Sequence, residues 1–90
     1  MTKADNHSYN AVDYCHAAFR HVHFNRPEKA IEAAHNAEVE MRKAHEAGNR
    51  YATHPKIIEA FDRADFAAAR AAWIVGEMKA GRLQKAWEAL

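Results

Sequence analysis

The chain has 90 residues, a length that fits one domain with a small hydrophobic core. Its 13 basic and 12 acidic residues nearly cancel, so we expect no long-range attraction to nucleic acid or to an anionic membrane. Cys15 is the only cysteine, which excludes an internal disulfide and favours a reducing, cytoplasmic location. The polar N-terminus predicts no secretory signal, and no apolar run is long enough for a transmembrane helix.

Alanine dominates the composition, with 21 copies against two leucines. Alanine has the highest helix propensity, and its small side chain lets helices approach closely. The sequence therefore predicts an all-α fold: a small antiparallel bundle of three longer helices plus a short C-terminal helix. Residues 1–90 would form this single domain, with residues 1–6 as a loose N-terminal tail.

The first helix is expected from Asn6 or Ser8 to Phe24. Its inward stripe, at helical spacing, would comprise Tyr9, Val12, His16, Phe19 and His23, with Cys15 and Val22 alongside. Asn25 is placed to cap a second helix that has Pro27 in its first turn. Because the connection is short, the two helices should form an antiparallel hairpin.

The second helix should run to about Ala47 and end at Gly48 in a left-handed conformation. Its inward stripe would be Ile31, Ala34, Ala37, Met41 and Ala44. A loop from Arg50 to His54 precedes a third helix, which opens at Pro55 and is broken by Gly81. That helix carries apolar residues on more than one face, so we expect it to lie centrally or to meet a partner. One of its sides would hold Ile57, Ile58, Phe61, Ala64, Ala68, Ala72 and Val75.

Two pairs in the predicted hairpin have metal-ligand spacing, Glu32-x-x-His35 and Asp13-x-x-His16. In an antiparallel hairpin His16 would lie level with His35, and Asp13 with Glu38, at two adjacent levels. Imidazole and carboxylate together suit zinc, iron or manganese. The Glu32–His35 pair resembles one of the two Glu-x-x-His pairs of ferritin-like di-iron proteins, which implies a metal-binding bundle. A second Glu-x-x-His and the bridging glutamates are missing, so a dimer would have to complete the site. We favour solvated or structural histidines and no cofactor.

No phosphate-binding loop, nucleophile elbow or Cys-x-x-Cys motif is present, and we expect no enzyme activity. Cys15 is interpreted as a small buried hydrophobic residue. A nucleic-acid-associated regulator is a further alternative, because basic residues cluster near both ends of the second helix. The residues concerned are Arg20, Arg26, Arg42, Lys43 and Arg50. Glutamates interleave with them and would repel a phosphate backbone, so the prediction is against this function.

Large apolar residues are concentrated in the last third of the chain, and such residues are enriched at binding hot spots. The candidate protein-interface residues are Phe66, Trp73, Met78, Leu83, Trp87 and Leu90. For Trp73 a place in the chain's own core is favoured; for Trp87 and Leu90 both roles stay open. The main prediction is a non-enzymatic protein-binding module that inhibits or regulates by covering a surface of a protein partner, by self-association as a homo-oligomer, or both. Helical chains of this size without motifs are common among phage- and plasmid-borne inhibitors, including anti-CRISPR and immunity-type proteins.

Overall fold

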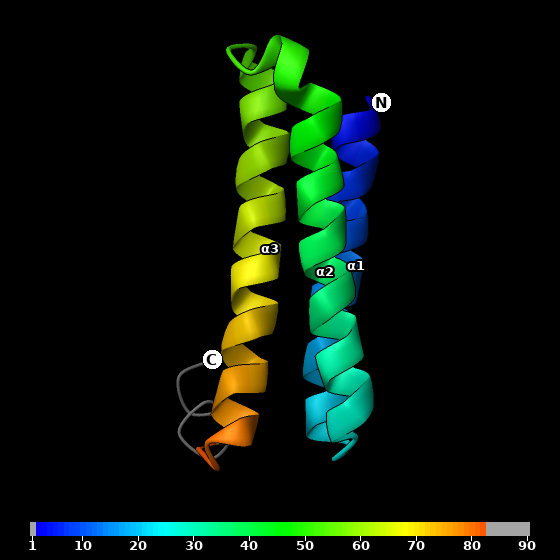
Figure 1. Ribbon diagram of the computed structural model, residues 1–90, viewed down its shortest axis with the longest axis vertical. Coiled ribbons are helices and arrows are strands. Elements are labelled where there is room, and N and C mark those ends of the chain that lie inside the picture. Colours follow the sequence, from blue (N-terminus) through cyan, green and yellow to red (C-terminus); the bar gives the residue numbers. More distant parts are fainter. Residues whose placement is uncertain (1, 83–90) are drawn as a thin grey trace.

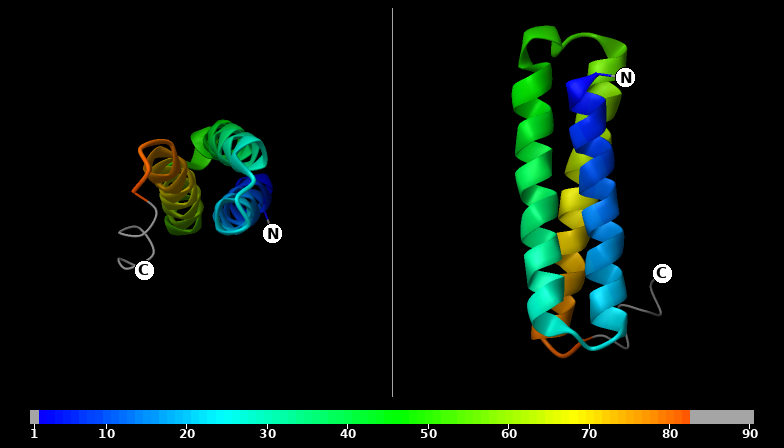
Figure 2. Two further views of the ribbon diagram at one scale, coloured as in Figure 1. Left: turned by 90° about the horizontal axis from the view of Figure 1, so that it is seen from below. Right: turned by 90° about the vertical axis from the view of Figure 1, so that its right-hand side faces the viewer.

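The computed structural model describes residues 2–82, which form three helices packed side by side (Figure 1). The elements are α1 (Lys3–His23), α2 (Pro27–Gly48), the 3-10 turn η1 (Asn49–Tyr51) and α3 (Pro55–Lys79). Helix α2 runs antiparallel to α1 and α3, and each helix contacts both others around one shared core (Figure 2). The predicted all-helical antiparallel bundle is confirmed for these residues. The expected short C-terminal helix, with Leu83, Trp87 and Leu90, lies outside the described residues.

Within residues 2–82, no helix combines the length and the apolar character needed to cross a bilayer.

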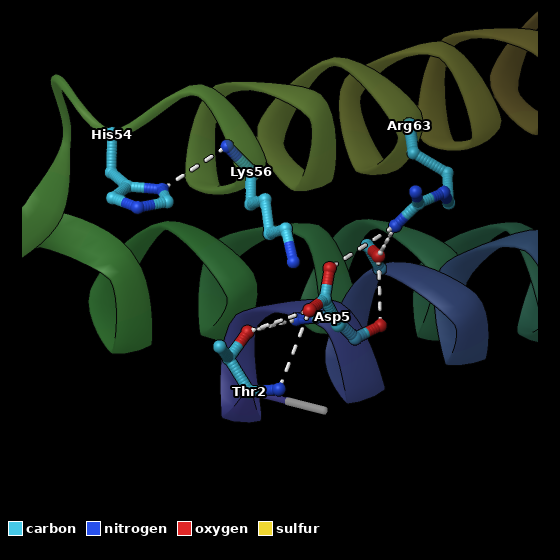
Figure 3. Close-up of polar contacts among 6 residues, drawn as sticks. Thr2, Asp5, His54, Lys56 and Arg63 are labelled. Carbon is cyan, nitrogen blue, oxygen red and sulfur yellow. Dashed lines mark hydrogen bonds and ion pairs between the residues drawn. The ribbon is translucent and has the colours of Figure 1, made fainter.

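Helix α1 begins earlier than the sequence predicted, because Thr2 caps it. The Thr2 hydroxyl accepts a hydrogen bond from the backbone N–H of Asp5 at 3.0 Å (Figure 3). The Asp5 carboxylate in turn accepts one from the backbone N–H of Thr2 at 3.3 Å. This reciprocal pair is a capping box, with aspartate in the place usually taken by glutamate. Residues 2–6 therefore belong to the helix and its cap, and the expectation of a loose tail at residues 1–6 is wrong for them.

The turn between α1 and α2 is also built differently from the prediction. Asn25 has a left-handed backbone, with φ of 56°, and its N–H donates to the carbonyl of Val22. The N–H of Arg26 donates to the carbonyl of His21 at 2.8 Å. These bonds form a Schellman-type end of α1, in which asparagine tolerates the left-handed conformation. Asn25 thus ends the first helix; Arg26 takes the cap position of the second, without a side-chain hydrogen bond.

Gly48 is the last residue of α2, but its backbone is right-handed, with φ of −95°. The reason for glycine here is close packing against α3. A Cβ atom at this position would lie 2.7 Å from Cε1 of Phe61 and 2.8 Å from Cγ2 of Ile57. Gly81, by contrast, has φ of 73° and follows the end of α3, as the sequence predicted. The start of α3 at Pro55 is also confirmed, and the His54 side chain caps it by accepting a hydrogen bond from the backbone N–H of Lys56.

Small residues form the centre of the core, and the large apolar residues flank it. Most of the buried hydrophobic residues are alanine, and Ile74 is the largest fully buried side chain among those described. In α1 the buried positions are Ala4, Ser8, Ala11, Cys15, Ala18 and Val22. The predicted stripe was one residue out of phase: Tyr9, His16 and His23 are exposed. Ile31 and Ile58 are likewise exposed. Alanine at the contact lines allows close approach of the backbones, which leaves large side chains room only at the edges.

Polar contacts join all three helix pairs near the start of α1. His7 of α1 lies 2.6 Å from the carboxylate of Glu40 on α2, and His45 of α2 lies 2.7 Å from that of Asp65 on α3. Arg63 of α3 donates to the buried Ser8 hydroxyl of α1 at 2.8 Å (Figure 3). These contacts fix the relative positions of the helices along their axes, which a core of uniform alanines specifies only weakly.

Candidate functional site

Helices α1 and α3 present a row of large side chains along the seam between them. From α1 come residues spaced three and four apart, and α3 contributes a matching row. We define the α1–α3 face by Tyr9, Val12, His16 and Phe19 of α1 and Arg63, Phe66, Arg70 and Trp73 of α3. Its centre is a groove of about 380 Å³. The groove is lined by Val12, Cys15, His16, Phe19, Phe66, Ala67 and Arg70.

Arginine and aromatic side chains alternate along this face. The Arg63 guanidinium carbon lies 4.2 Å from the ring centroid of Tyr9. Arg70 lies 5.3 Å from the ring of Phe19 and 5.4 Å from that of Phe66, so it bridges both helices. The ring centroids of Phe19 and Trp73 are 6.4 Å apart. Cation–π and aromatic contacts of this kind orient the side chains without removing them from solvent.

Tyr9, Phe66 and Trp73 of this face are exposed, and Phe66 is the most exposed large hydrophobic residue among those described. Phe66 is 65% exposed and Trp73 is 38% exposed, although both belong to the same helix as the buried Ile74. Of the predicted interface residues, these two lie on the α1–α3 face, whereas Met78 is half-buried against the core. Trp73 does not occupy the core position that the sequence favoured, because Ala71 and Ile74 fill the contact line there.

The two arginines of the face differ in how their donors are used. Arg63 donates to Ser8 and lies 3.5 Å from a carboxylate oxygen of Asp5, so its role is internal. Within residues 2–82, no carboxylate lies within ion-pair distance of Arg70. Neither Arg63 nor Arg70 was predicted from the sequence as a functional residue. A row of Arg63, Phe66, Arg70 and Trp73 at helical spacing was the available signal, but it is legible only once the buried side of α3 is known.

Cys15 lines the floor of the groove and is 5% exposed, as expected for a small hydrophobic residue. Burial raises the pKa of its thiol, and the positive charge of Arg70 opposes this effect only in part. A raised pKa keeps the thiol protonated at neutral pH, whereas a nucleophilic cysteine needs a stabilised thiolate. The surroundings of Cys15 therefore do not stabilise a thiolate.

The five candidate metal ligands lie on different sides of the bundle. His16 lines the α1–α3 groove, while His35 and Glu38 line a groove between α2 and α3. Glu32 faces the α1–α2 seam, and Asp13 is exposed on α1. Within residues 2–82, no three histidine, cysteine or acidic side chains are placed to hold one metal ion. The hairpin is antiparallel as predicted, but its contact line runs through alanines, which separates His16 from the pair His35 and Glu38.

The candidate nucleic-acid residues are divided between the two ends of α2. Arg20 and Arg26 lie near the α1–α2 turn, with Arg26 over the ring of Phe24. Arg42 and Lys43 lie toward the other end of α2, beyond which Arg50 lies in η1. Arg42 is paired with Glu38 at 2.6 Å, and Lys43 lies 4.0 Å from Glu40. The ends of a 22-residue helix are about 30 Å apart, so the five cations form no single basic surface.

Comparison with known proteins gives no further guide to the site. No protein-family model, no curated protein and no solved structure matches the chain significantly.

Proposed function

We propose that this chain is a non-enzymatic protein-binding module whose binding surface is the α1–α3 face. It would inhibit or regulate its protein partner by covering a surface of that partner. The observation that carries the proposal is the exposure of Phe66 and Trp73 on one seam, next to Arg70.

The residue types of the face and the existing orientation of its side chains both support this use. Tryptophan, tyrosine and arginine are the residues most enriched at energetic hot spots of protein interfaces. Aromatic side chains that are already oriented by neighbours lose little conformational entropy when a partner covers them. Phe66 in particular contributes little to the core, since most of its surface is in solvent. Binding therefore explains a large apolar ring at this position better than folding does.

Self-association is the alternative occupant of the same face. An alanine-rich core buries little area per residue, so a second copy would add apolar contacts that a chain of this size lacks. Both forms of the proposal make the same face the interface, and they differ in the partner that covers it.

The test places a photoreactive benzoylphenylalanine at position 66 in one variant and at position 51 in another. Tyr51 is 60% exposed in η1, so it controls for exposed aromatic character away from the face. We expect crosslinking from position 66, to one protein of the native host or to a second copy. The purified pair should then lose affinity in Phe66→Ala by a factor of about 30 or more, the range of a hot spot.

Phe66→Ala should leave the thermal stability nearly unchanged, which separates binding from folding. Tyr51→Ala should retain full affinity. Equal crosslinking from both positions, or unaltered affinity in Phe66→Ala, would remove the α1–α3 face from consideration.

A further inference from the structure

We infer that the centre of the α1–α3 face recognises a partner segment in which an apolar side chain stands beside a carboxylate. Arg70 would bind the carboxylate, and the groove floor would take the apolar group. This inference rests on the proposed function, because it names the chemistry of the partner at the same surface.

The first argument is the orientation of Arg70. Its guanidinium is held between the rings of Phe19 and Phe66, which come from different helices. A guanidinium carries five N–H donors in a planar fork, the geometry that matches a carboxylate in a bidentate pair. Because the aromatic contacts already restrict the side chain, little further entropy is lost when an anion binds.

The second argument is charge. Of the arginines within residues 2–82, only Arg63 and Arg70 are half-buried, and Arg63 has a carboxylate partner in Asp5. Arg70 has none within residues 2–82, although it lies at the centre of the face and is half-buried. A cation that is to be covered by a protein partner needs a negative partner there, since an unpaired buried charge is strongly unfavourable.

The surroundings of Arg70 favour a single carboxylate over a polyanion. The groove beneath Arg70 is apolar, with Val12, Phe19 and Phe66 along it. Asp13 and Asp62 are exposed, one helical turn from His16 and Phe66 respectively. Their negative charges at the edges of the face would repel a nucleic-acid backbone but permit one carboxylate at the centre.

The probe is 4-phenylbutyrate, which joins an apolar ring to a carboxylate and models such a segment. Its neutral control is 4-phenylbutanamide, and inorganic phosphate controls for any anion. Binding would be followed by NMR at the Arg70 Nε–H and at the ring protons of Phe19 and Phe66. We expect saturable shifts with the carboxylate and affinity about tenfold weaker for the amide, the effect of one charge-assisted pair. Phosphate should bind more weakly than the carboxylate.

Arg70→Met should abolish the preference for carboxylate over amide, whereas Arg20→Met, on the exposed side of α1, should retain it. Arg70→Lys keeps the charge but loses the fork, and is expected to show an intermediate preference. Equal binding of acid and amide to the wild type, or phosphate binding as tight as the acid, would overturn the inference. If a crosslinked partner depends on Phe66 but binds Arg70→Met normally, the proposed function stands and this inference fails.

Discussion

Because α2 and α3 approach closely at Gly48, we expect Gly48→Ala to destabilise the protein, although alanine has a higher helix propensity than glycine. Replacing glycine by alanine inside a helix normally stabilises a protein, by up to about 1 kcal/mol. At Gly48, however, the new Cβ would lie 2.7 and 2.9 Å from two ring carbons of Phe61 and 2.8 Å from Cγ2 of Ile57. Real Cβ atoms do not occur at such distances, so Phe61, Ile57 or the helix must move.

Neither neighbour can move without loss. Ile57 is 5% exposed and β-branched, so its Cγ2 is held close to its own backbone. The Phe61 ring is stacked on His45, with centroids 4.2 Å apart, and His45 is bound to Asp65. Overpacking of this kind costs about 1–3 kcal/mol. After subtraction of the propensity gain, which is small at the last residue of a helix, Gly48→Ala should destabilise by about 1–2 kcal/mol, and the melting temperature should fall by roughly 5–15 °C.

Gly76 is the matched control, since it lies within α3 and an added Cβ would meet nothing within 4 Å. Gly76→Ala should raise the free energy of unfolding by about 0.5–1 kcal/mol. Both variants are measured by thermal and urea denaturation followed by circular dichroism. In the double variant Gly48→Ala/Phe61→Leu the smaller side chain should relieve part of the clash, which a double-mutant cycle detects. A Gly48→Ala variant as stable as Gly76→Ala would refute the close approach itself.

Two further predictions concern the cap and the metal alternative. The hydrogen bond from Thr2 lowers the pKa of Asp5 in the folded state, so its contribution to stability is present above the ordinary pKa of about 3.9 and is lost as pH falls below it. Thr2→Ala should therefore destabilise the protein by about 1 kcal/mol at neutral pH, and urea titrations from pH 5 to 2 should show a smaller acid-dependent loss of stability. Thr53→Ala, in the exposed loop, should change neither quantity. Because the candidate metal ligands lie in separate grooves, equimolar zinc, iron or manganese should leave the melting temperature unchanged; stoichiometric binding that disappears in both His16→Ala and His35→Ala would contradict this.

The helices themselves could be predicted because local sequence signals mark where they start and stop. Pro55 and Gly81 mark the two ends of α3. Proline suits the first turn of a helix, and glycine adopts the left-handed conformation after its end more easily than other residues do. At Asn25 and Gly48 the residue type was informative but its role was misread. Asparagine can cap the helix that follows or end the helix that precedes, and glycine can permit a left-handed residue or a close contact. The contact with Phe61 belongs to the tertiary structure, so nothing near Gly48 in the sequence distinguishes the two roles.

The orientation of the helices about their own axes could not be predicted in the same way. In α1 the stripe through Tyr9, Val12 and His16 has the correct period, yet the buried stripe runs through Ala11 and Cys15. A shift of one residue turns a helix by about 100°, which exchanges the core with its flank. Hydrophobicity ranks the larger residues as more buried, whereas close packing of backbones selects the smaller ones. The interhelical contacts of Arg63 and His7 join residues far apart in sequence and leave no local pattern.

The same preference for small residues links the fold to the candidate binding surface. Once alanines such as Ala64 and Ala71 occupy the contact lines, Phe66 and Trp73 cannot be accommodated between the helices. They are displaced to the seam, where Arg70 and Phe19 orient them. Under the proposed function, stability and recognition therefore depend on different residues of one helix. Alanine positions determine whether the bundle forms, and the large residues beside them are left available to bind. This separation is what allows Phe66→Ala and Gly48→Ala to test the two properties independently.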